Sequence, residues 1–211
     1  MKNYSLAEIE TWERFYRANF INSLTGFKSV NLIGTANTAG QTNLGIFSSI
    51  VHIGANPALV GYINRPIEAA PHTLANIEAN GAYTINHIQP SFLQKAHQTS
   101  AKYDAAISEF EVVGLTPEYL QNFKAPFVKE STVKYALELQ DIMPIKLNKT
   151  FLVIGKVIAV YLNEGILQAD GFLQLEKAQS LCSNGIDAYY ETALLSRYEY
   201  AKPDKIAEKL K

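Results

Sequence analysis

Three short polar segments contain the side chains of this chain that are best suited to binding chemistry. They span residues 43–49, 64–73 and 97–103 of the 211 residues. Together they offer hydroxyls, amides, one arginine and one lysine, which are groups that hold a phosphorylated, planar ligand. The candidate binding residues are Asn43, Phe47, Ser48, Ser49, Asn64, Arg65, His72, Thr73, Gln98, Thr99, Ser100 and Lys102.

The first two segments each have a plain structural explanation beside the functional one. Phe47 offers an apolar wall, and the serines that follow it offer hydrogen bonds to the edge of a heterocycle, but two serines on a strand are also common without a ligand. Arg65 can fork around phosphate oxygens, and a helix that begins near Thr73 can direct N–H groups at the same anion. The alternative is a turn with a solvated arginine and a capping threonine.

The third segment lies between two expected helices. Two hydroxyls, an amide and Lys102 lie close together there and could complete an anion pocket. The alternative is a polar loop in which Thr99 or Ser100 caps the next helix. No segment defines a ligand alone, so their order along the chain carries the information.

Familiar catalytic and metal-binding motifs are absent from the sequence. There is no G-x-G-x-x-G, P-loop, G-x-S-x-G, H-E-x-x-H or paired C-x-x-C. The four histidines lack metal-ligand spacing, and the single cysteine, Cys182, has the surroundings of an ordinary thiol. We therefore predict no metal site and no catalytic side chain, which points to a bound cofactor as the reactive part.

The composition is typical of a folded protein that is not built for a polyanionic partner. Apolar residues make up 47%, charged residues 18%, and the formal net charge is -1. This charge gives no electrostatic reason to expect nucleic acid or an anionic membrane. No apolar run reaches the roughly 18 residues that span a bilayer, and the N-terminus is too polar for a signal peptide. With no internal disulfide possible, we expect a cytoplasmic protein.

Strands joined by tight turns are expected to position the three segments. Their sparse β-α-β spacing favours an antiparallel barrel over a doubly wound parallel sheet. A helix should begin after Pro71 with Thr73 as its N-cap, and Asn80-Gly81 should end it. Apolar and β-branched runs predict strands over residues 29–36, 43–53, 58–63, 82–88, 133–142 and 150–162.

Helices are expected at the N-terminus and in an insert at about residues 90–125. Ser5-x-x-Glu8 is a capping box that starts the first helix. The insert should contain short helices over 91–98, 103–110 and 116–123, whereas 187–200 is open between a helix and an irregular arm. An apolar stripe on the first helix would pack on the body of the fold or in a dimer contact, and it comprises Leu6, Ile9, Trp12, Tyr16 and Phe20.

The order and spacing of these features resemble the flavin reductase-like family of FMN-binding split-barrel proteins. The resemblance covers about residues 22–165, and none of its motifs is as specific as a P-loop. The later segments 96–104, 109–119 and 124–131 belong to it. In this chain the leading motif residues are Gly40, Asn43, Ser48, Ser49, Asn56, Pro57, Arg65, Pro66, His72, Thr73 and the stretch 83–86.

The resemblance implies a mainly β fold, namely a six-stranded antiparallel Greek-key split barrel with helical additions. Residues 1–21 would form an N-terminal helix that packs on the barrel, 22–165 the FMN-binding domain and 166–211 a C-terminal arm. The family also implies a homodimer with FMN near the subunit interface. No nucleic-acid or membrane partner is expected.

The resemblance assigns a role to each candidate binding residue. Phe47, Ser48 and Ser49 would line the isoalloxazine ring, mainly through backbone groups, with Asn43 near its polar edge. Arg65, His72 and Thr73 would hold the phosphate end, and Asn64 is counted with this segment. Residues to close over that end would be Gln98, Thr99, Ser100 and Lys102.

Three functions stay open at this point. The first is an NAD(P)H-dependent flavin reductase, in which NADH or NADPH passes a hydride to FMN. The second is an FMN-binding electron carrier that reacts poorly with nicotinamide cofactors. The third is a barrel that holds another small ligand through Arg65. The sequence leaves open the electron acceptor, the choice between NADH and NADPH, and whether flavin is a tightly held cofactor or a diffusing substrate.

Overall fold

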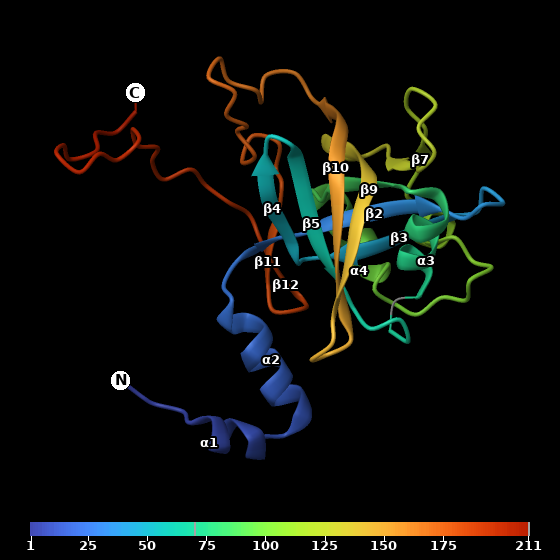
Figure 1. The fold of residues 1–211 in the computed structure, drawn as a ribbon, viewed down its shortest axis with the longest axis horizontal. Coiled ribbons are helices and arrows are strands. Elements are labelled where there is room, and N and C mark those ends of the chain that lie inside the picture. The colour runs from blue at the N-terminus through green and yellow to red at the C-terminus, as the bar shows by residue number, and fades with distance from the viewer. Residues whose placement is uncertain (70, 211) are drawn as a thin grey trace.

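A seven-stranded antiparallel sheet forms the body of the protein (Figure 1). The computed structural model describes residues 1–69 and 71–210. The strands run in the order β3-β2-β6-β9-β10-β5-β4. Their bounds are β2 Asn31–Ala36, β3 Thr42–Phe47, β4 Ile50–Ala55, β5 Ala58–Asn64, β6 Ala82–His87, β9 Val133–Ile145 and β10 Thr150–Leu162.

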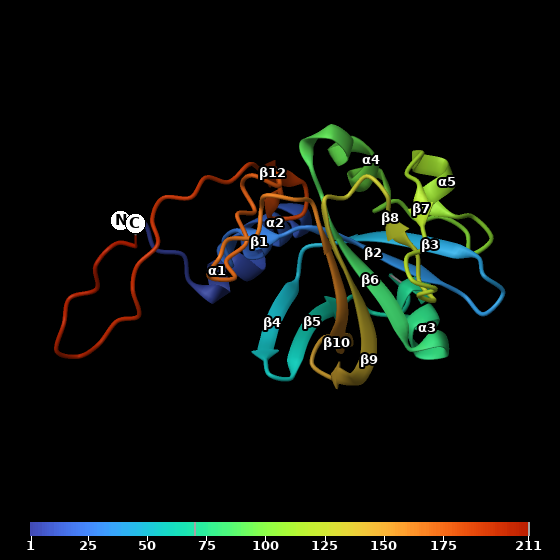
Figure 2. The same ribbon diagram turned by 90° about the horizontal axis from the view of Figure 1, so that it is seen from above.

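The two end strands of this sheet, β3 and β4, follow each other in the chain and are joined only by Ser48 and Ser49. In a flat sheet, seven strands spaced about 4.8 Å apart would separate the end strands by roughly 29 Å. Three residue steps span only about 11 Å. The sheet must therefore curl until its ends approach, and the result is the open barrel seen in Figure 2.

The predicted mainly β split barrel is confirmed, but one predicted strand was wrong. The continuous strand expected over 43–53 is two strands, so the sheet has seven strands instead of six. β3 pairs with β2, whereas β4 pairs with β5 at the other end of the sheet. The chain has to leave one edge before it joins the other, and Ser48-Ser49 makes that crossing outside both strand ladders.

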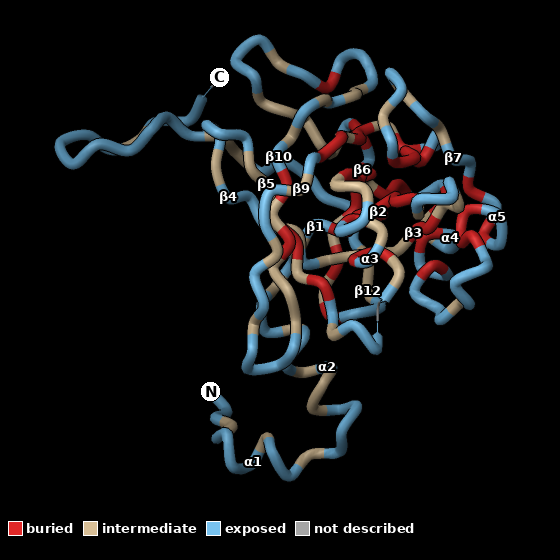
Figure 3. The backbone as a smooth tube through the Cα atoms, turned by 45° about the vertical axis from the view of Figure 1, so that its right-hand side comes forward, coloured by how far each residue is buried: buried red, intermediate tan, exposed pale blue. Residues whose placement is uncertain are grey.

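Two apolar clusters lie on opposite sides of β2, whose six residues are all buried. Leu32 belongs to a cluster with Phe92 and Phe110 from the helical insert. Its neighbour Ile33 belongs to the barrel interior, with Tyr62 and Tyr83. Alternate side chains of a strand point to opposite faces, so β2 holds barrel and insert together. Figure 3 shows the buried backbone concentrated in this region.

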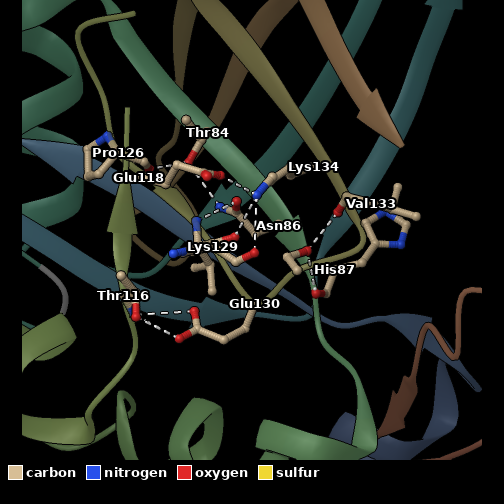
Figure 4. A network of polar contacts seen from close by, with 12 residues as sticks. Thr84, Asn86, His87, Thr116, Glu118, Pro126, Lys129, Glu130, Val133 and Lys134 are labelled. Carbon is tan, nitrogen blue, oxygen red and sulfur yellow. Dashed lines mark hydrogen bonds and ion pairs between the residues drawn. The ribbon is translucent and has the colours of Figure 1, made fainter. Parts of the chain in front are cut away.

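A buried polar network fixes the return of the chain from the insert to the barrel (Figure 4). The side-chain amide of Asn86 donates to Thr84 Oγ1 at 2.9 Å, and its oxygen accepts from the backbone N–H of Val128 at 2.9 Å. Lys134 Nζ lies 2.6 Å from Glu118 Oε2 and donates to the Val128 carbonyl at 3.2 Å. Each polar group therefore gains a partner, which burial requires.

Helix α3 (Pro71–Asn80) begins before Thr73, so that threonine is not its N-cap, although the helix ends at Asn80-Gly81 as expected.

The insert at about residues 90–125 contains less helix than the sequence predicted. The expected helix over 116–123 is absent: residues 117–118 form a short strand that pairs with residues 127–128, and the Thr116 backbone and hydroxyl bind the Glu130 carboxylate. The elements are η1 Pro90–Phe92, α4 Leu93–Gln98, α5 Glu109–Val113, β7 Pro117–Glu118 and β8 Phe127–Val128.

The predicted helix over 103–110 is also wrong in its position. Its first residues form turns, and the short α5 begins only at Glu109. Contacts distant in sequence set that start, since Ser108 shares a hydrogen bond of 2.6 Å with the Thr42 hydroxyl. Glu109 in turn accepts from the Leu44 backbone N–H at 2.9 Å.

The N-terminal helices do not pack on the barrel, contrary to the expectation for residues 1–21. α1 (Leu6–Thr11) and α2 (Arg14–Leu24) contain no buried residue and stand away from the body (Figure 1). Ser5 caps α1 as predicted, but Glu13 then caps a second helix. The aromatic stripe packs on itself instead, because Trp12 contacts both Tyr16 and Phe20 edge to face with centroids about 5 Å apart.

After β10 the chain forms a long loop, then a short hairpin that begins at Cys182, and finally an extended arm. β1 (Lys28–Ser29), β11 (Cys182–Asn184) and β12 (Ala188–Tyr190) form a separate three-stranded sheet. Beyond Tyr190 the described chain is irregular and mostly exposed (Figure 3), which answers the open choice between helix and arm. Among the described residues, no helix is long and apolar enough to cross a membrane.

Candidate functional site

A cavity of about 390 Å³ opens where the barrel ends approach each other, beside the Ser48-Ser49 crossing. This volume lies in the range of small-molecule and cofactor sites. Ten of the twelve candidate binding residues line it, although they come from four separate parts of the chain. They are Asn43, Phe47, Ser48, Ser49, Arg65, His72, Thr73, Thr99, Ser100 and Lys102.

The end of β3 supplies one wall of the cavity. The Phe47 ring is held edge to face against the buried Tyr62 ring, with centroids 5.0 Å apart. Ser48 and Ser49 lie outside the strand ladders, although the Ser49 carbonyl still accepts from Ile63 N–H at 3.0 Å. Gly45 keeps this wall open, since an added Cβ would lie 3.0 Å from the Phe47 ring. The wall therefore combines an aromatic surface with backbone polar groups.

Two cationic side chains and one histidine also line this cavity, together with Glu68. Arg65 follows β5, Lys102 follows α4, and His72 lies in the first turn of α3. Arg65 and Lys102 are exposed and form no ion pair or side-chain hydrogen bond with any residue in 1–69 or 71–210. Free cations beside a helix N-terminus favour the binding of an anion.

Other predicted residues also hold the cavity walls together. The side-chain amide of Asn43 donates to Thr73 Oγ1 at 3.0 Å and to Thr35 Oγ1 at 3.3 Å, which ties α3 to the barrel. Thr99 is buried and donates to the Ala96 carbonyl at 2.8 Å. These contacts position the site whether or not the same groups touch a ligand.

Two candidate binding residues do not line the cavity. Asn64 is fully buried, and its amide donates to the Arg65 carbonyl at 2.8 Å. Gln98 is exposed and donates to the Tyr103 hydroxyl at 3.0 Å. Asn64 thus shapes the backbone before Arg65, and Gln98 holds Tyr103, which does line the cavity.

The cavity also contains residues that the sequence did not indicate. Glu109 lines it, and burial raises the pKa of its carboxyl, opposed by the Leu44 N–H and the nearby His72. The sequence placed Glu109 inside an expected helix, and nothing in that position indicated that its side chain would line a binding cavity. Lys28 and a group from the C-terminal hairpin complete the wall, and the hairpin residues are Ser183, Gly185, Ile186 and Tyr189.

A second cavity, of about 480 Å³, is lined by both residues of β1 and by His87. His87 Nδ1 lies 3.0 Å from Ser180 Oγ, and burial lowers the pKa of the imidazole to about 4. Within the described residues, no group of three or more histidine, cysteine, aspartate or glutamate side chains is arranged to hold a metal ion.

His87 should make the fold sensitive to acid. Its folded pKa lies below the unfolded value of about 6.5, so the unfolded chain binds the proton first and stability falls as the pH drops between these values. We expect a loss of about 3 kcal/mol between neutral pH and about pH 4, measured by urea unfolding. The variant His87→Gln should lose this part of the pH dependence. An unchanged profile in that variant would contradict the assignment.

The fold and the cavity define a split-barrel protein with a mixed aromatic and cationic binding site. Residues 24–178 match the model of the flavin reductase like domain, which is most of the chain. The protein therefore belongs to the flavin reductase-like family. It is also 22% identical over 152 residues to an uncharacterized protein of Aquifex aeolicus (strain VF5), which covers 71% of this chain and 76% of that protein.

Solved structures share the fold over nearly the full length. A candidate flavin reductase with a split barrel domain from Shewanella frigidimarina NCIMB 400 is 48% identical, with a TM-score of 0.92 over 95% of this chain and 100% of that one. Component B of nitrilotriacetate monooxygenase from Bacillus cereus is 17% identical, with a TM-score of 0.81 over 93% and 98% of the two chains. Flavoredoxin of Desulfovibrio vulgaris (Miyazaki F) is 20% identical, with a TM-score of 0.70 over 85% and 92%.

Proposed function

We propose that this protein binds FMN in the barrel cavity and uses it as an oxidoreductase of the flavin reductase type, with NADH or NADPH as reductant. The observation that carries the proposal is the pairing of two different walls in one cavity. An aromatic and backbone wall at Phe47–Ser49 suits the isoalloxazine ring, and the free cations Arg65 and Lys102 suit a phosphate. Membership of the flavin reductase-like family supports a flavin.

The chain's own groups can serve both the ring and the phosphate of FMN. Backbone N–H and C=O groups at Ser48-Ser49 can hydrogen-bond the ring edge. Arg65 can fork around phosphate oxygens, and the first turn of α3 at His72 adds N–H donors to the same anion. An unpartnered buried hydroxyl, Ser183 Oγ, also lies in the wall. These groups bind, orient and exclude water.

Bound FMN would supply the electron and hydride chemistry, so the protein needs no nucleophile or general acid of its own. Protein groups would act by holding the ring against Phe47 and by presenting positive charge near the polar groups of the flavin. Lys28 and Lys102 are the lysines that line the cavity and could do this. Glu109 would instead repel extra negative charge when ionised.

We further propose that the working form is a homodimer. Val51, Ile53 and Leu152 gather over Gly61 on the outer face of β4, β5 and β10, and the first two are 45% and 41% exposed. Together with the unburied N-terminal helices, this apolar face fits a second copy of the chain. Sedimentation equilibrium should give twice the chain mass, whereas a monomer at micromolar concentration would refute the dimer.

An FMN-binding electron carrier is the second candidate function. It would use the same cavity and the same cofactor but would be reduced by a protein donor. The fold likeness to flavoredoxins, at 20% identity, shows the fold alone, so the reductant must decide between the two functions.

Flavin binding is tested by titrating the purified chain with FMN, riboflavin and FAD while flavin fluorescence is followed. We expect saturable quenching at one site per chain, with FMN tighter than riboflavin because only FMN engages Arg65 and Lys102. A chain that quenches none of the three flavins would overturn the proposal.

A further inference from the structure

The C-terminal hairpin reaches the cavity from outside the part of the chain that matches the flavin reductase like domain. That match ends at residue 178, whereas β11 and β12 span Cys182–Asn184 and Ala188–Tyr190. β11 pairs with β1, so that Ser183 lies opposite Lys28. Both residues line the cavity. The hairpin is therefore an additional wall of the site.

A direct hydrogen bond joins this wall to the opposite one. The Tyr189 hydroxyl lies 2.6 Å from His97 Nδ1, and the two rings meet edge to face with centroids 5.7 Å apart. His97 lies in the last turn of α4, just before the loop that carries Ser100 and Lys102 into the cavity. Figure 2 places β12 and α4 on the same side of the barrel. The contact thus links the hairpin to the proposed phosphate end.

The hairpin also presents a polar group that lacks a partner. Ser183 is only 2% exposed, and its Oγ has no hydrogen-bond partner among the described residues. A buried hydroxyl without a partner is costly, and such groups are rare in folded proteins. Because Ser183 lines the cavity, a polar atom of a bound ligand would satisfy it.

The base of the hairpin is fixed to the core, whereas its far end is held by the pairing of β12 with β11, by the Tyr190 ring against Phe27 and by Tyr189. Leu181 N–H donates to the Ile88 carbonyl at 3.0 Å, and Leu181 belongs to the core. Gly185 turns the hairpin with a φ of 67°, and the next residue, Ile186, is 50% exposed beside the cavity. Among the described residues, the Tyr189–His97 contact is the hydrogen bond that joins this half of the hairpin to α4 and the loop after it.

We infer that the hairpin clasps the bound flavin, with Ser183 as a binding residue and the Tyr189–His97 pair as positioning residues, so that FMN is a retained cofactor and not a freely diffusing substrate. This inference rests on the proposed function. It predicts that the full-length chain releases FMN slowly. Release requires the link between the hairpin and the loop after α4 to open first.

The test is the rate of FMN release after rapid dilution of the FMN-loaded, full-length protein, followed by the recovery of FMN fluorescence. Tyr189→Phe and His97→Phe should each speed release about tenfold, the change expected for one lost hydrogen bond of this kind. The double variant should release FMN no faster than either single variant, because both remove the same contact. Ser183→Ala should speed release several-fold.

Tyr190→Phe is the matched control, since Tyr190 lies on the same strand but lines the second cavity. It should release FMN at the wild-type rate, and thermal unfolding should show that Tyr189→Phe is as stable as this control. If Tyr189→Phe released FMN at the wild-type rate, the inference that the hairpin retains FMN would be wrong, whereas the proposal that the protein binds FMN would still stand. A wild-type chain that binds no FMN would instead overturn the proposed function and the clasp with it.

Discussion

Replacing Arg65 by Ala should weaken FMN binding about 10- to 100-fold, or roughly 1.5–3 kcal/mol, the range for a lost charge-assisted hydrogen bond. Arg65 lines the cavity and makes no ion pair with the described residues, so the change removes no contact that stabilises the fold. Riboflavin lacks the phosphate, and its affinity should stay within about twofold. Fluorescence titration of both ligands measures the difference.

Two variants control this result. Arg65→Lys keeps the charge but not the planar fork, so its FMN affinity should fall between those of the wild type and Arg65→Ala. Arg197→Ala removes an arginine that pairs with Asp170 outside the cavity, and FMN affinity should not change. If Arg65→Ala lost equal affinity for FMN and for riboflavin, the assignment of Arg65 to the phosphate of FMN would be wrong.

The largest effect on stability is expected from Gly34→Ala on β2. An added Cβ would overlap the Pro126 carbonyl oxygen and lie 2.7 Å from Thr84 Oγ1. Thr84 donates to that same carbonyl at 2.7 Å, so the methyl group would crowd a buried hydrogen bond as well. We expect the free energy of unfolding to fall by about 2–4 kcal/mol. Urea unfolding and a drop in melting temperature of roughly 5–15 °C would show it.

Gly54→Ala provides the comparison for this change. Gly54 also lies in a strand, but its added Cβ would meet only the Pro57 carbonyl oxygen at 3.3 Å. Its effect should be under about 1 kcal/mol. Equal stability of the two variants would mean that β2 and the insert are less tightly packed at Gly34 than described.

The barrel strands could be predicted closely because their signals are local. β5, β6 and β10 lie within about two residues of the predicted ranges, since turns and β-branched runs bound them. The strand spacing favoured an antiparallel barrel, and the resemblance added that it is a split barrel. The resemblance could not supply the break at Ser48-Ser49, because that break depends on which strand each half pairs with at opposite ends of the sheet.

Most errors have the same physical origin, which is a partner distant in sequence. The Thr73 hydroxyl suggested a helix cap, yet in the fold it accepts from Asn43. Thr116-Pro117 suggested a helix start, but Glu130 and Lys134 hold this segment extended. These competing contacts are not visible in a local pattern. At the N-terminus, the rings of the aromatic stripe contact one another within the chain, while its expected dimer contact stays a prediction.

The candidate site could be predicted in part, where its residues carry a local signal. Ten of the candidate residues line the cavity, and the sequence indicated them because each carries ordinary ligand chemistry at a strand or helix end. Glu109 and the hairpin residues were missed, because only the three-dimensional fold brings α5 and the C-terminal segment to the cavity. Of these, Ser183 and Tyr189 are the residues on which the proposed retention of FMN depends.

Anaerobic mixing of the FMN-loaded protein with NADH or NADPH tests the central claim most directly. If this chain is a flavin reductase-type oxidoreductase, at least one of the two should bleach the bound flavin's absorbance in a saturable, single-site reaction. Bound FMN that neither NADH nor NADPH reduces, but that a reduced electron-transfer protein does reduce, would contradict the claim and assign the chain to the electron carriers.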